Sequence, residues 1–405
     1  MPCRSNTSGL DSVRASATIR LVNPVPARDS AVRSSDFALR PLTDLHTDAL
    51  YEHVKGAKDI TKRTSIGHLD IPRMKEAGVT GQVFAVWTNP EKTNPGERAP
   101  FVHKAIDALE DICRRYPDDI AIAKSPDEML DINGCASPDQ PVTLSESDES
   151  KGLSVTASTP DFEPWCLGGE LRPSGRVAAI LGIEGGHALE GDLANLDRFF
   201  ERGVRVLTIT WNNSNEFAGS CMDKPETGLT ELGRRALSRM NELGMIVDLS
   251  HSSPRTFYDT LEVSTAPVIC SHSACKARCD FPRNLDDDQL RALAQHRGVI
   301  GIVFLPYFLT HKEGEATLDD VLDHAEHAIQ VAGIDSVALG SDFDGFGKPP
   351  KGLEDVTRLP VLLAGLRSRG YSDSDVAQVS GLNFLRLWRE VADGSGIQHK
   401  DTKGS

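Results

Sequence analysis

Two histidines stand 21 residues apart in this chain, each directly after a short apolar segment. His251 follows the segment Met245–Leu249, His272 follows Pro267–Cys270, and Pro254 opens a helical segment between them. Consecutive parallel strands require a crossover of about a dozen or more residues, which is usually helical, so the stretch predicts strand, helix and strand. Both imidazoles would then emerge at one edge of a parallel sheet, where α/β proteins carry their functional residues. This stretch alone does not decide between a shared role and two unrelated polar strand ends.

The same alternation of apolar and helical segments runs through most of the chain. Amphipathic spacing marks the helical segments; Ile106, Leu109 and Ile112, for example, recur every three residues. Eight apolar segments have the length of strands: 42–45, 79–87, 176–183, 204–210, 245–249, 267–270, 298–304 and 336–339. Eight strands alternating with helices predict an α/β fold of the (β/α)8 TIM-barrel type, with a doubly wound open sheet as the second choice. No GxGxxG motif follows the first strand, which counts against a dinucleotide-binding sheet.

Three segments fall outside this pattern. Residues 1–36 are rich in serine and arginine and predict a disordered N-terminal tail, and residues 396–405 form a short C-terminal tail. Residues 133–175 are rich in Ser, Pro, Asp and Glu and predict a polar insertion before the third strand. A loop that enters a barrel strand lies at the face opposite the strand ends that carry function. We therefore assign residues 37–395 to one barrel domain and expect the insertion to lie away from its functional site.

Composition excludes several classes of partner. The chain has 44 Lys and Arg against 59 Asp and Glu, a net charge of −15, which argues against nucleic acid or an anionic membrane as a partner. No apolar run approaches the ~18 residues of a membrane span, and no compact apolar core of a secretory signal is recognised. The eight cysteines form no CxxC pair, so reduced thiols are expected. A cytoplasmic protein is the simplest interpretation.

Titratable residues stand at the ends of five of the eight predicted strands. They are three imidazoles and three carboxylates: His46, Asp48, Glu184, His251, His272 and Asp342. In a barrel these positions converge at one mouth, whereas His324 and His327 lie on a predicted amphipathic helix and are expected to be solvated. Imidazole and carboxylate ligands suit zinc, and paired hydrolytic sites hold their ions ~3.5–4 Å apart. We expect two zinc ions bridged by Glu184; the alternative is a set of hydrogen-bonded residues on a metal-free barrel.

A two-metal site of this kind favours hydrolysis. Metal coordination can lower the pKa of water from 15.7 to about 7, so a bridging hydroxide can form near neutral pH. Cleavage of an amide also requires a proton at the leaving nitrogen, and Asp342 is the carboxylate free to deliver it. Arg283, eleven residues after His272, could bind a substrate carboxylate through two parallel hydrogen bonds or could be a surface arginine on a loop.

The strand-end residues lie in short motifs that follow one another in order along the chain. These motifs are His46-x-Asp48, Ile183-Glu184-Gly185-Gly186-His187, Asp248-Leu249-Ser250-His251, Ser271-His272-Ser273 with Arg283-Asn284, and Gly340-Ser341-Asp342-Phe343-Asp344-Gly345. Together with Gly352-Leu353-Glu354-Asp355 and Asn383-Phe384-Leu385-Arg386, they resemble the membrane (renal) dipeptidase family of metallopeptidases, in the amidohydrolase superfamily. The resemblance covers about residues 40–390.

The resemblance implies a dinuclear zinc (β/α)8 hydrolase that cleaves dipeptides with free termini by attack of a metal-bridging hydroxide. By position in the motifs, His46 and Asp48 would hold one zinc ion. His251 and His272 would hold the other, and Glu184 would bridge the two ions and take part in catalysis. The resemblance also suggests a homodimer.

Further roles follow from the same resemblance. Arg283 would bind the C-terminal carboxylate of the dipeptide, and Asp342 would carry the proton. Trp211 follows the fourth strand, where better-known members have a histidine that helps to stabilise the tetrahedral intermediate; an indole donates one hydrogen bond but cannot titrate. We place Trp211 among the substrate-binding residues and expect it to affect substrate range more than metal binding. The animal members are secreted and lipid-anchored, and neither feature is recognised in this sequence.

Two other functions stay open on the sequence alone. The same scaffold could hydrolyse another small amide, such as an N-acyl amino acid or a β-lactam, or it could be a catalytically silent barrel used as a binding module. Related barrels often combine a first-strand His-x-His with a carbamylated lysine bridge. Here the first strand carries His46-x-Asp48 and no lysine ends a predicted strand, which favours the dipeptidase. The complete set of five ligand positions argues against a silent barrel.

Overall fold

The computed structural model describes residues 41–134, 175–311 and 315–395. The tails expected at 1–36 and 396–405, and nearly all of the insertion expected at 133–175, lie outside these ranges, so their predicted disorder stays a prediction. Within the described ranges, no helix combines the length and the apolar character that crossing a bilayer requires.

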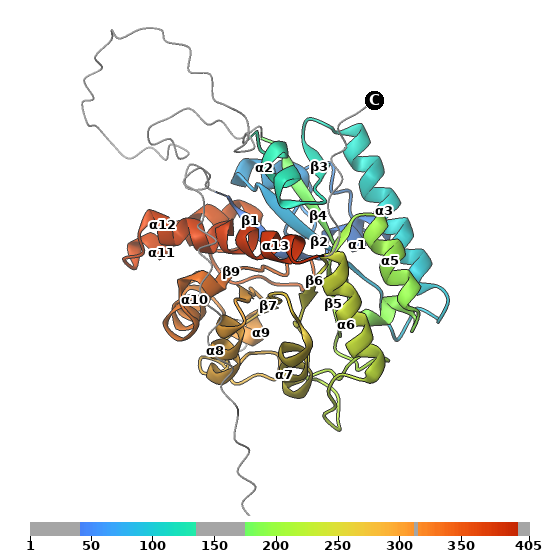
Figure 1. The fold of residues 1–405 in the computed structure, drawn as a ribbon. Coiled ribbons are helices and arrows are strands. Elements are labelled where there is room, and N and C mark those ends of the chain that lie inside the picture. The colour runs from blue at the N-terminus through green and yellow to red at the C-terminus, as the bar shows by residue number, and fades with distance from the viewer. Residues whose placement is uncertain (1–40, 135–174, 312–314, 396–405) are drawn as a thin grey trace, which may run out of the picture.

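Eight parallel strands close into a barrel, which confirms the predicted (β/α)8 fold (Figure 1). The barrel strands are β1 (Thr43–Thr47), β2 (Gly81–Trp87), β4 (Val177–Glu184), β5 (Val204–Thr208), β6 (Ile246–Asp248), β7 (Ile269–Ser273), β8 (Val299–Ile302) and β9 (Val337–Leu339). From β4 onward each strand pairs with the next, β9 pairs with β1, and β2 pairs with both β1 and β4. This closed order excludes the open, doubly wound sheet.

A further strand, β3 (Ile120–Ile122), is absent from the sequence-based prediction. It pairs with the first part of β4, from Val177 to Ala179, whereas β5 pairs with β4 only from Leu181 onward. Since β2 runs along the other edge of β4, β3 occupies the part of the edge that β5 leaves open. A three-residue apolar segment is too short for periodicity to distinguish it from a loop.

Helices surround the barrel (Figure 1). They are α1 (Ala49–Val54), α2 (Ile71–Ala77), α3 (Arg98–Arg115), α4 (Pro126–Ile132), α5 (Leu193–Glu201), α6 (Glu231–Leu243), α7 (Pro254–Val263), α8 (Asp287–Gln295), α9 (Pro306–Leu309), α10 (Leu318–Ala332), α11 (Leu359–Ser368), α12 (Asp373–Ala377) and α13 (Asn383–Asp393). Proline in the first turn and a capping serine explain the start of α7, where the Ser253 side chain accepts from the Thr256 amide. The single helix expected over 373–391 is interrupted between α12 and α13, where Gly381 has non-helical backbone angles.

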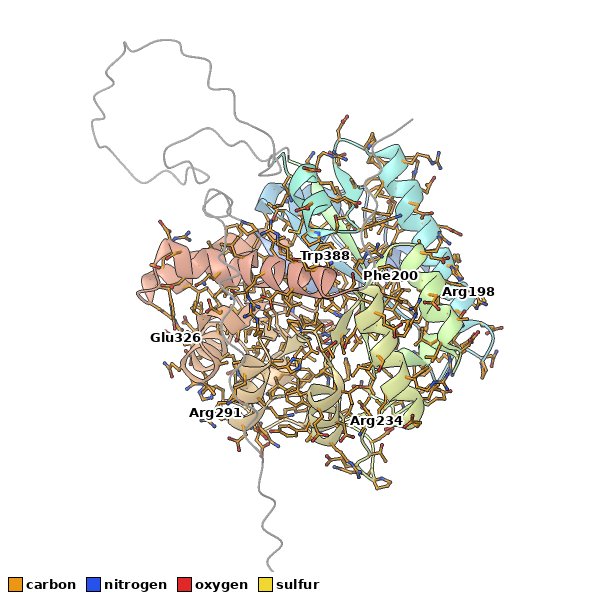
Figure 2. The ribbon with its side chains drawn as sticks, in the orientation of Figure 1. Arg198, Phe200, Arg234, Arg291, Glu326 and Trp388 are labelled. Atoms are coloured by element: carbon orange, nitrogen blue, oxygen red, sulfur yellow. The ribbon has the colours of Figure 1, made fainter. Side chains whose placement is uncertain are left out.

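The barrel interior is filled by apolar side chains. One cluster of buried residues includes at least one member from each barrel strand: Leu45, Val83, Ile180, Val206, Ile246, Ile269, Val299 and Ala338. Only the interior is common to all eight strands, so this cluster must occupy it. Trp388 of α13 belongs to the same cluster and lies near the centre of the molecule, whereas Arg198 and Arg291 lie at its periphery (Figure 2).

The first and last barrel strands meet in a short seam. Asp44 of β1 pairs with Leu339 of β9, and Thr47 bridges to Phe343 just beyond β9. The buried Asp44 carboxylate accepts hydrogen bonds from the Ser341 amide at 2.7 Å and from its hydroxyl at 2.6 Å. Burial raises the pKa of Asp44 to about 6, although these hydrogen bonds oppose the rise. Side-chain hydrogen bonds thus reinforce a seam that has little backbone pairing.

The expectation that His324 is solvated is wrong. Its side chain on α10 is buried; Nδ1 accepts from the Cys275 amide at 3.0 Å, and Nε2 lies 3.0 Å from the Leu309 carbonyl oxygen. His327 is partly exposed and pairs with Asp287 at 2.7 Å. Helical periodicity identified the face that carries His324, but it could not show that the short helix α9 packs against that face.

Candidate metal centre

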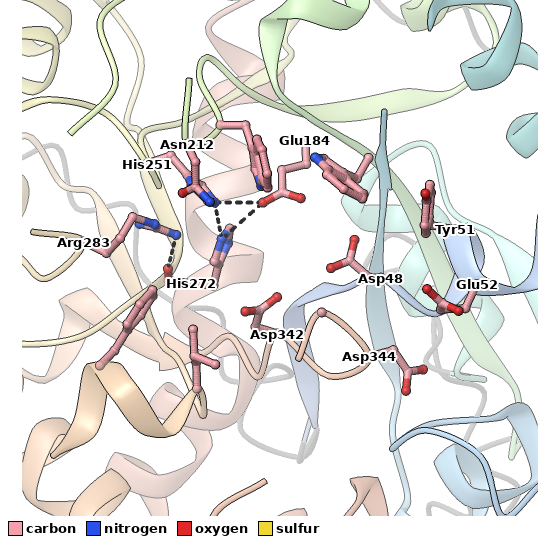
Figure 3. A pocket seen from close by; sticks show the side chains of 15 residues that line it. Asp48, Tyr51, Glu52, Glu184, Asn212, His251, His272, Arg283, Asp342 and Asp344 are labelled. Atoms are coloured by element: carbon pink, nitrogen blue, oxygen red, sulfur yellow. Dashed lines mark hydrogen bonds and ion pairs between the residues drawn. The ribbon is translucent and has the colours of Figure 1, made fainter. Parts of the chain in front are cut away.

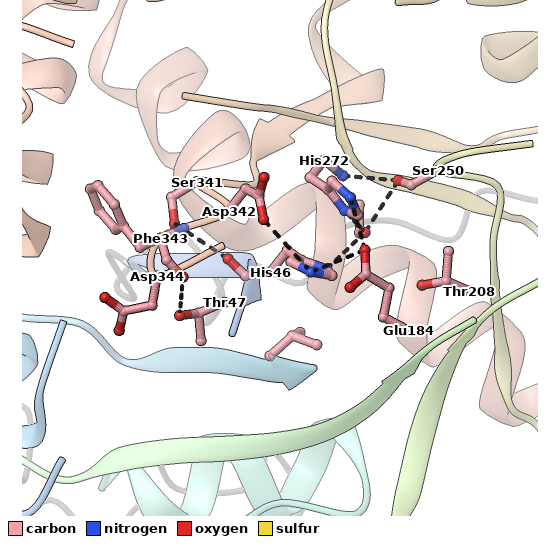
Figure 4. Close-up of polar contacts among 12 residues, drawn as sticks. His46, Thr47, Glu184, Thr208, Ser250, His272, Ser341, Asp342, Phe343 and Asp344 are labelled. Atoms are coloured by element: carbon pink, nitrogen blue, oxygen red, sulfur yellow. Dashed lines mark hydrogen bonds and ion pairs between the residues drawn. The ribbon is translucent and has the colours of Figure 1, made fainter. Parts of the chain in front are cut away.

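Six side chains from five strands converge at the C-terminal mouth of the barrel (Figures 3 and 4). They are the six residues that the sequence placed at strand ends: His46, Asp48, Glu184, His251, His272 and Asp342. His46 and His272 lie within β1 and β7, and Glu184 is the last residue of β4. All six are buried in the described structure. The structure therefore confirms that the six side chains lie close together at one mouth of the barrel, as predicted.

The Glu184 carboxylate lies at the centre of the three imidazoles. Its Oε1 is 2.8 Å from His251 Nε2, 3.4 Å from His272 Nε2 and 3.8 Å from His46 Nε2. The Nε2 atoms of His251 and His272 are 2.9 Å apart, and the two rings of His46 and His272 have centroids 3.9 Å apart. Imidazole and carboxylate donors gathered this closely form a group that could hold a metal ion.

Two sets of donor atoms have the spacing of a metal site. His46, Glu184 and His272 offer atoms that all lie within 4.8 Å of one another, and so do His46, Asp48 and Asp342. His46 belongs to both sets, whereas the sequence interpretation gave it to one ion only. The assignment of each residue to one ion or the other stays a prediction.

Hydrogen bonds at Nδ1 orient two of the imidazoles so that their Nε2 atoms point toward Glu184. The Nδ1 atom of His251 lies 3.0 Å from Asn212 Oδ1, and that of His272 lies 2.9 Å from Ser271 Oγ. His46 Nε2 and Asp48 Oδ1 are buried and have no hydrogen-bond partner in the described structure. Buried polar atoms are nearly always satisfied, so these two atoms fit a bound cation better than a metal-free barrel.

Protonation states also fit a cation. Burial lowers the pKa of His46 and His251 and lowers that of His272 to about 3, and the Arg283 guanidinium adds to the effect on all three. Burial raises the pKa of Glu184 to about 8. Neutral imidazole is the form that binds metal, and a bound cation would relieve the desolvation of buried carboxylates.

A buried carboxylate behind the imidazoles was not assigned a role from the sequence. Asp248, the last residue of β6, accepts hydrogen bonds from the hydroxyls of Thr208 and Ser271, each at 2.6 Å, and from the Ser271 amide at 2.8 Å. Because the Ser271 hydroxyl donates to Asp248, it accepts from His272 Nδ1. Asp248 thereby selects the imidazole tautomer that presents Nε2 to a metal. Its motif was visible in the sequence, but this contact between neighbouring strands was not.

Replacing Asp248 with asparagine should weaken metal binding by about 10- to 100-fold, the usual effect of removing a group that orients a ligand. The asparagine amide can donate to Ser271, which reverses the hydrogen bond that fixes His272. Competition with a chelator of known affinity measures the change, and thermal unfolding of the metal-free protein checks that the variant is folded. Unaltered affinity would contradict this role for Asp248.

Backbone geometry at the mouth is unusual. His251 and Asp342 have φ angles of 69° and 61°, in the left-handed region that residues with a Cβ rarely adopt. Such conformations concentrate at functional sites, where the surrounding structure holds them. A Cβ at Gly345 would collide with the carboxylate oxygens of Asp342 and Asp48, so glycine at this position lets the two carboxylates lie close together.

The mouth opens into a cavity of about 210 Å³ (Figure 3). Arg283 lines one side; it is buried and packs its guanidinium 5.3 Å from the centre of the Phe308 ring, so it is not a surface arginine. Its Nη2 donates to the His272 carbonyl oxygen at 3.4 Å. Trp211 also lines the cavity, with its ring centre 4.9 Å from that of Trp87 and 6.3 Å from that of His251. Both residues therefore line the cavity, and their contact with a substrate stays a prediction.

Comparison with known proteins identifies the family. A model of the membrane dipeptidase family, peptidase family M19, matches residues 37–143 and 169–400. The chain belongs to the membrane dipeptidase family. Two uncharacterized dipeptidases of Schizosaccharomyces pombe are each 41% identical, over 220 and 227 residues, which are 54% and 55% of this chain and the same shares of theirs. The chain thus spans about half the length of these curated relatives.

Solved structures of similar proteins share this fold over most of its length. A metallopeptidase from Rhodobacter sphaeroides, liganded with a phosphinate mimic of the dipeptide L-Ala-D-Ala, is 28% identical with a TM-score of 0.72, covering 87% of this chain and 99% of that one. The probable dipeptidase PvdM from Pseudomonas aeruginosa is 22% identical with a TM-score of 0.70, covering 86% and 100% of the two chains. The second likeness concerns the fold alone.

Proposed function

We propose that this member of the membrane dipeptidase family is a zinc-dependent dipeptidase that acts on dipeptides with free termini. The observation that carries the proposal is the meeting of three imidazoles and Glu184 at the barrel mouth, where His46 Nε2 is buried without a hydrogen-bond partner in the described structure. Family membership supports the same activity.

The residues present fit two zinc ions. His46 and Asp48 would hold one, His251 and His272 would hold the other, and Glu184 would bridge them. Zinc bound there would lower the pKa of water and supply the nucleophile for amide hydrolysis, as in other two-metal hydrolases.

The chain's own residues would bind the substrate and move the proton. Arg283 would bind the C-terminal carboxylate through charge-assisted hydrogen bonds, because its guanidinium faces the cavity and its Nε has no partner in the described structure. Asp342 would donate a proton to the leaving nitrogen; its Oδ1 lies 4.0 Å from His46 Nε2, beside the proposed metal ligands. Trp211 and Trp87 would form an apolar wall that limits the access of bulk water.

A panel of small amides tests this function. Purified protein with added zinc should hydrolyse L-Ala-L-Ala or L-Ala-D-Ala, lose activity after chelation and regain it with zinc, and contain two zinc ions per chain. N-acetylalanine, which lacks the free amine, should be a poor substrate. Faster hydrolysis of N-acyl amino acids than of dipeptides would instead assign the protein as another kind of amidohydrolase. Less than one tightly bound metal ion per chain would favour a catalytically silent binding module.

Removal of residues 137–160 should leave dipeptide turnover within about twofold of the full chain. The excised segment lies outside the described residues, but it precedes β4, which begins at Val177 and ends at Glu184. At about 3.3 Å per residue, the strand separates its first residue from the site by roughly 23 Å. Comparison of kcat and KM for the two proteins checks the expectation, which a change of substrate preference or a large loss of kcat would refute.

A further inference from the structure

The two ends of the cavity carry side chains of opposite charge. Figure 3 shows Arg283 on one side, Tyr51 and Glu52 on the opposite side, and the proposed metal ligands between them. If Arg283 holds the C-terminal carboxylate and the scissile amide lies at the metal ligands, the N-terminal residue of the substrate must occupy the end that holds Glu52. This step rests on the function proposed above.

Glu52 lies one helical turn beyond the metal ligand Asp48. Its amide donates to the Asp48 carbonyl oxygen at 3.2 Å, as in the first turn of a helix, and both side chains line the cavity. Residues four apart on a helix have Cβ atoms about 5–6 Å apart. The α-ammonium of a dipeptide is attached to the carbon next to the scissile carbonyl, so it must stay close to the metal ligands. Glu52 is better placed for the end of a long side chain.

The charge of Glu52 is not balanced by a neighbour. Asp344 at the same end forms a buried ion pair with Lys58 and accepts from the His68 amide at 2.6 Å. The half-buried Glu52 carboxylate has no ion pair or hydrogen-bond partner among the described residues. Lys55, on the next turn, places its ammonium over the Tyr51 ring, 5.9 Å from the ring centre. A cationic group is therefore the ligand chemistry that this end of the cavity lacks.

Aromatic rings line the path from the metal ligands toward Glu52. The ring centre of Trp87 lies 4.9 Å from that of Trp211 and 5.1 Å from that of Tyr51. A lysine or arginine side chain can pack its methylene groups along such a wall and present its charge at the end. The same rings attract a cation through their faces.

We propose that Glu52 is a specificity-determining residue that binds the cationic side chain of the substrate's N-terminal residue. The protein then prefers dipeptides that begin with lysine or arginine. Lysine and norleucine give the sharpest comparison, because their side chains have similar length and differ in the ammonium group.

The test measures kcat/KM for L-Lys-L-Ala and L-norleucyl-L-Ala with the zinc-loaded full chain. We expect a preference of about tenfold for the lysine dipeptide, the range of a partly screened charge-assisted contact, and a smaller preference at high salt. Glu52→Gln should bring the ratio near one, and Glu52→Lys should shift the preference toward L-Glu-L-Ala. Glu262→Gln, at an exposed position on α7 outside the cavity lining, should keep the wild-type ratio.

The outcomes separate this inference from the proposed function. The role of Glu52 is overturned if the wild-type protein hydrolyses the lysine and norleucine dipeptides equally well, or if the preference for lysine persists in Glu52→Gln. Neither result contradicts the proposed dipeptidase activity. Failure of the zinc-loaded wild-type protein to cleave either dipeptide, or any member of the alanine panel, overturns the proposed function together with the inference.

Discussion

An Asp342→Asn variant should keep its zinc and lose about 10²- to 10⁴-fold in kcat, the range that a positioned proton carrier contributes. Asparagine preserves the size of the side chain but cannot hold and release a proton. Burial and the nearby Asp48 and Glu184 carboxylates raise the pKa of Asp342, so the carboxyl group favours its protonated form before metal binds. Steady-state hydrolysis of a good dipeptide and elemental analysis of the same sample measure the two quantities.

A matched variant controls for the change of charge. Asp288 is exposed on α8 and pairs with Arg291 at 2.8 Å, so Asp288→Asn should leave kcat and zinc content at wild-type values. Near-normal turnover of Asp342→Asn would assign the proton transfer to another group. Loss of zinc would instead make Asp342 a metal ligand, as its place in one of the two sets of donor atoms allows.

The second large effect concerns Glu184. Its replacement by glutamine should reduce the zinc content from two ions to one or fewer per chain and lower kcat/KM by at least about 10³-fold, or ~4 kcal/mol of transition-state stabilisation. An amide oxygen ligates weakly and carries no charge, and Oε1 is the atom that all three imidazoles approach within 3.8 Å. Elemental analysis and dipeptide kinetics measure the two losses.

Stability distinguishes loss of metal from loss of fold. Burial raises the pKa of Glu184 to about 8 without metal, so at pH 7 the native carboxyl is mostly protonated and neutral, as glutamine is. The melting temperature of the metal-free protein should therefore change little in Glu184→Gln, while the stabilisation by added zinc should largely vanish. Glu201→Gln, at an exposed position on α5, should respond to zinc as the wild type does. A variant that still binds two ions would remove Glu184 from the bridging position.

The long elements and the site were predictable for one physical reason. A strand buried on both faces is a continuous apolar run, so the residue that ends it is visible in the sequence, as Glu184 after Val177–Ile183 illustrates. Once eight such runs close into a barrel, residues as distant in sequence as His46 and His272 must share one mouth. Neither step requires knowledge of side-chain contacts.

What depends on side-chain contacts was not predictable. The hydrogen bond between Asp248 and Ser271 depends on the register of β6 against β7, and the burial of His324 depends on the packing of α9 against α10. The strand β3 has only three residues, too few for a periodic signal. The cytoplasmic location, the homodimer and the tail boundaries stay predictions.

The seam between β1 and β9 bears on the stage of folding at which metal would bind. Asp44 and Ser341, which are hydrogen-bonded across it, are 297 residues apart, so bringing them together carries the entropic cost of closing a long loop. One of the two sets of donor atoms crosses this junction, because His46 and Asp48 belong to the β1 side and Asp342 follows β9. Zinc would then bind late and selectively to the finished ring, and at a hundredfold excess over Kd it would add about 2.7 kcal/mol to its stability. During refolding, the binding of zinc would then report the pairing of β1 with β9.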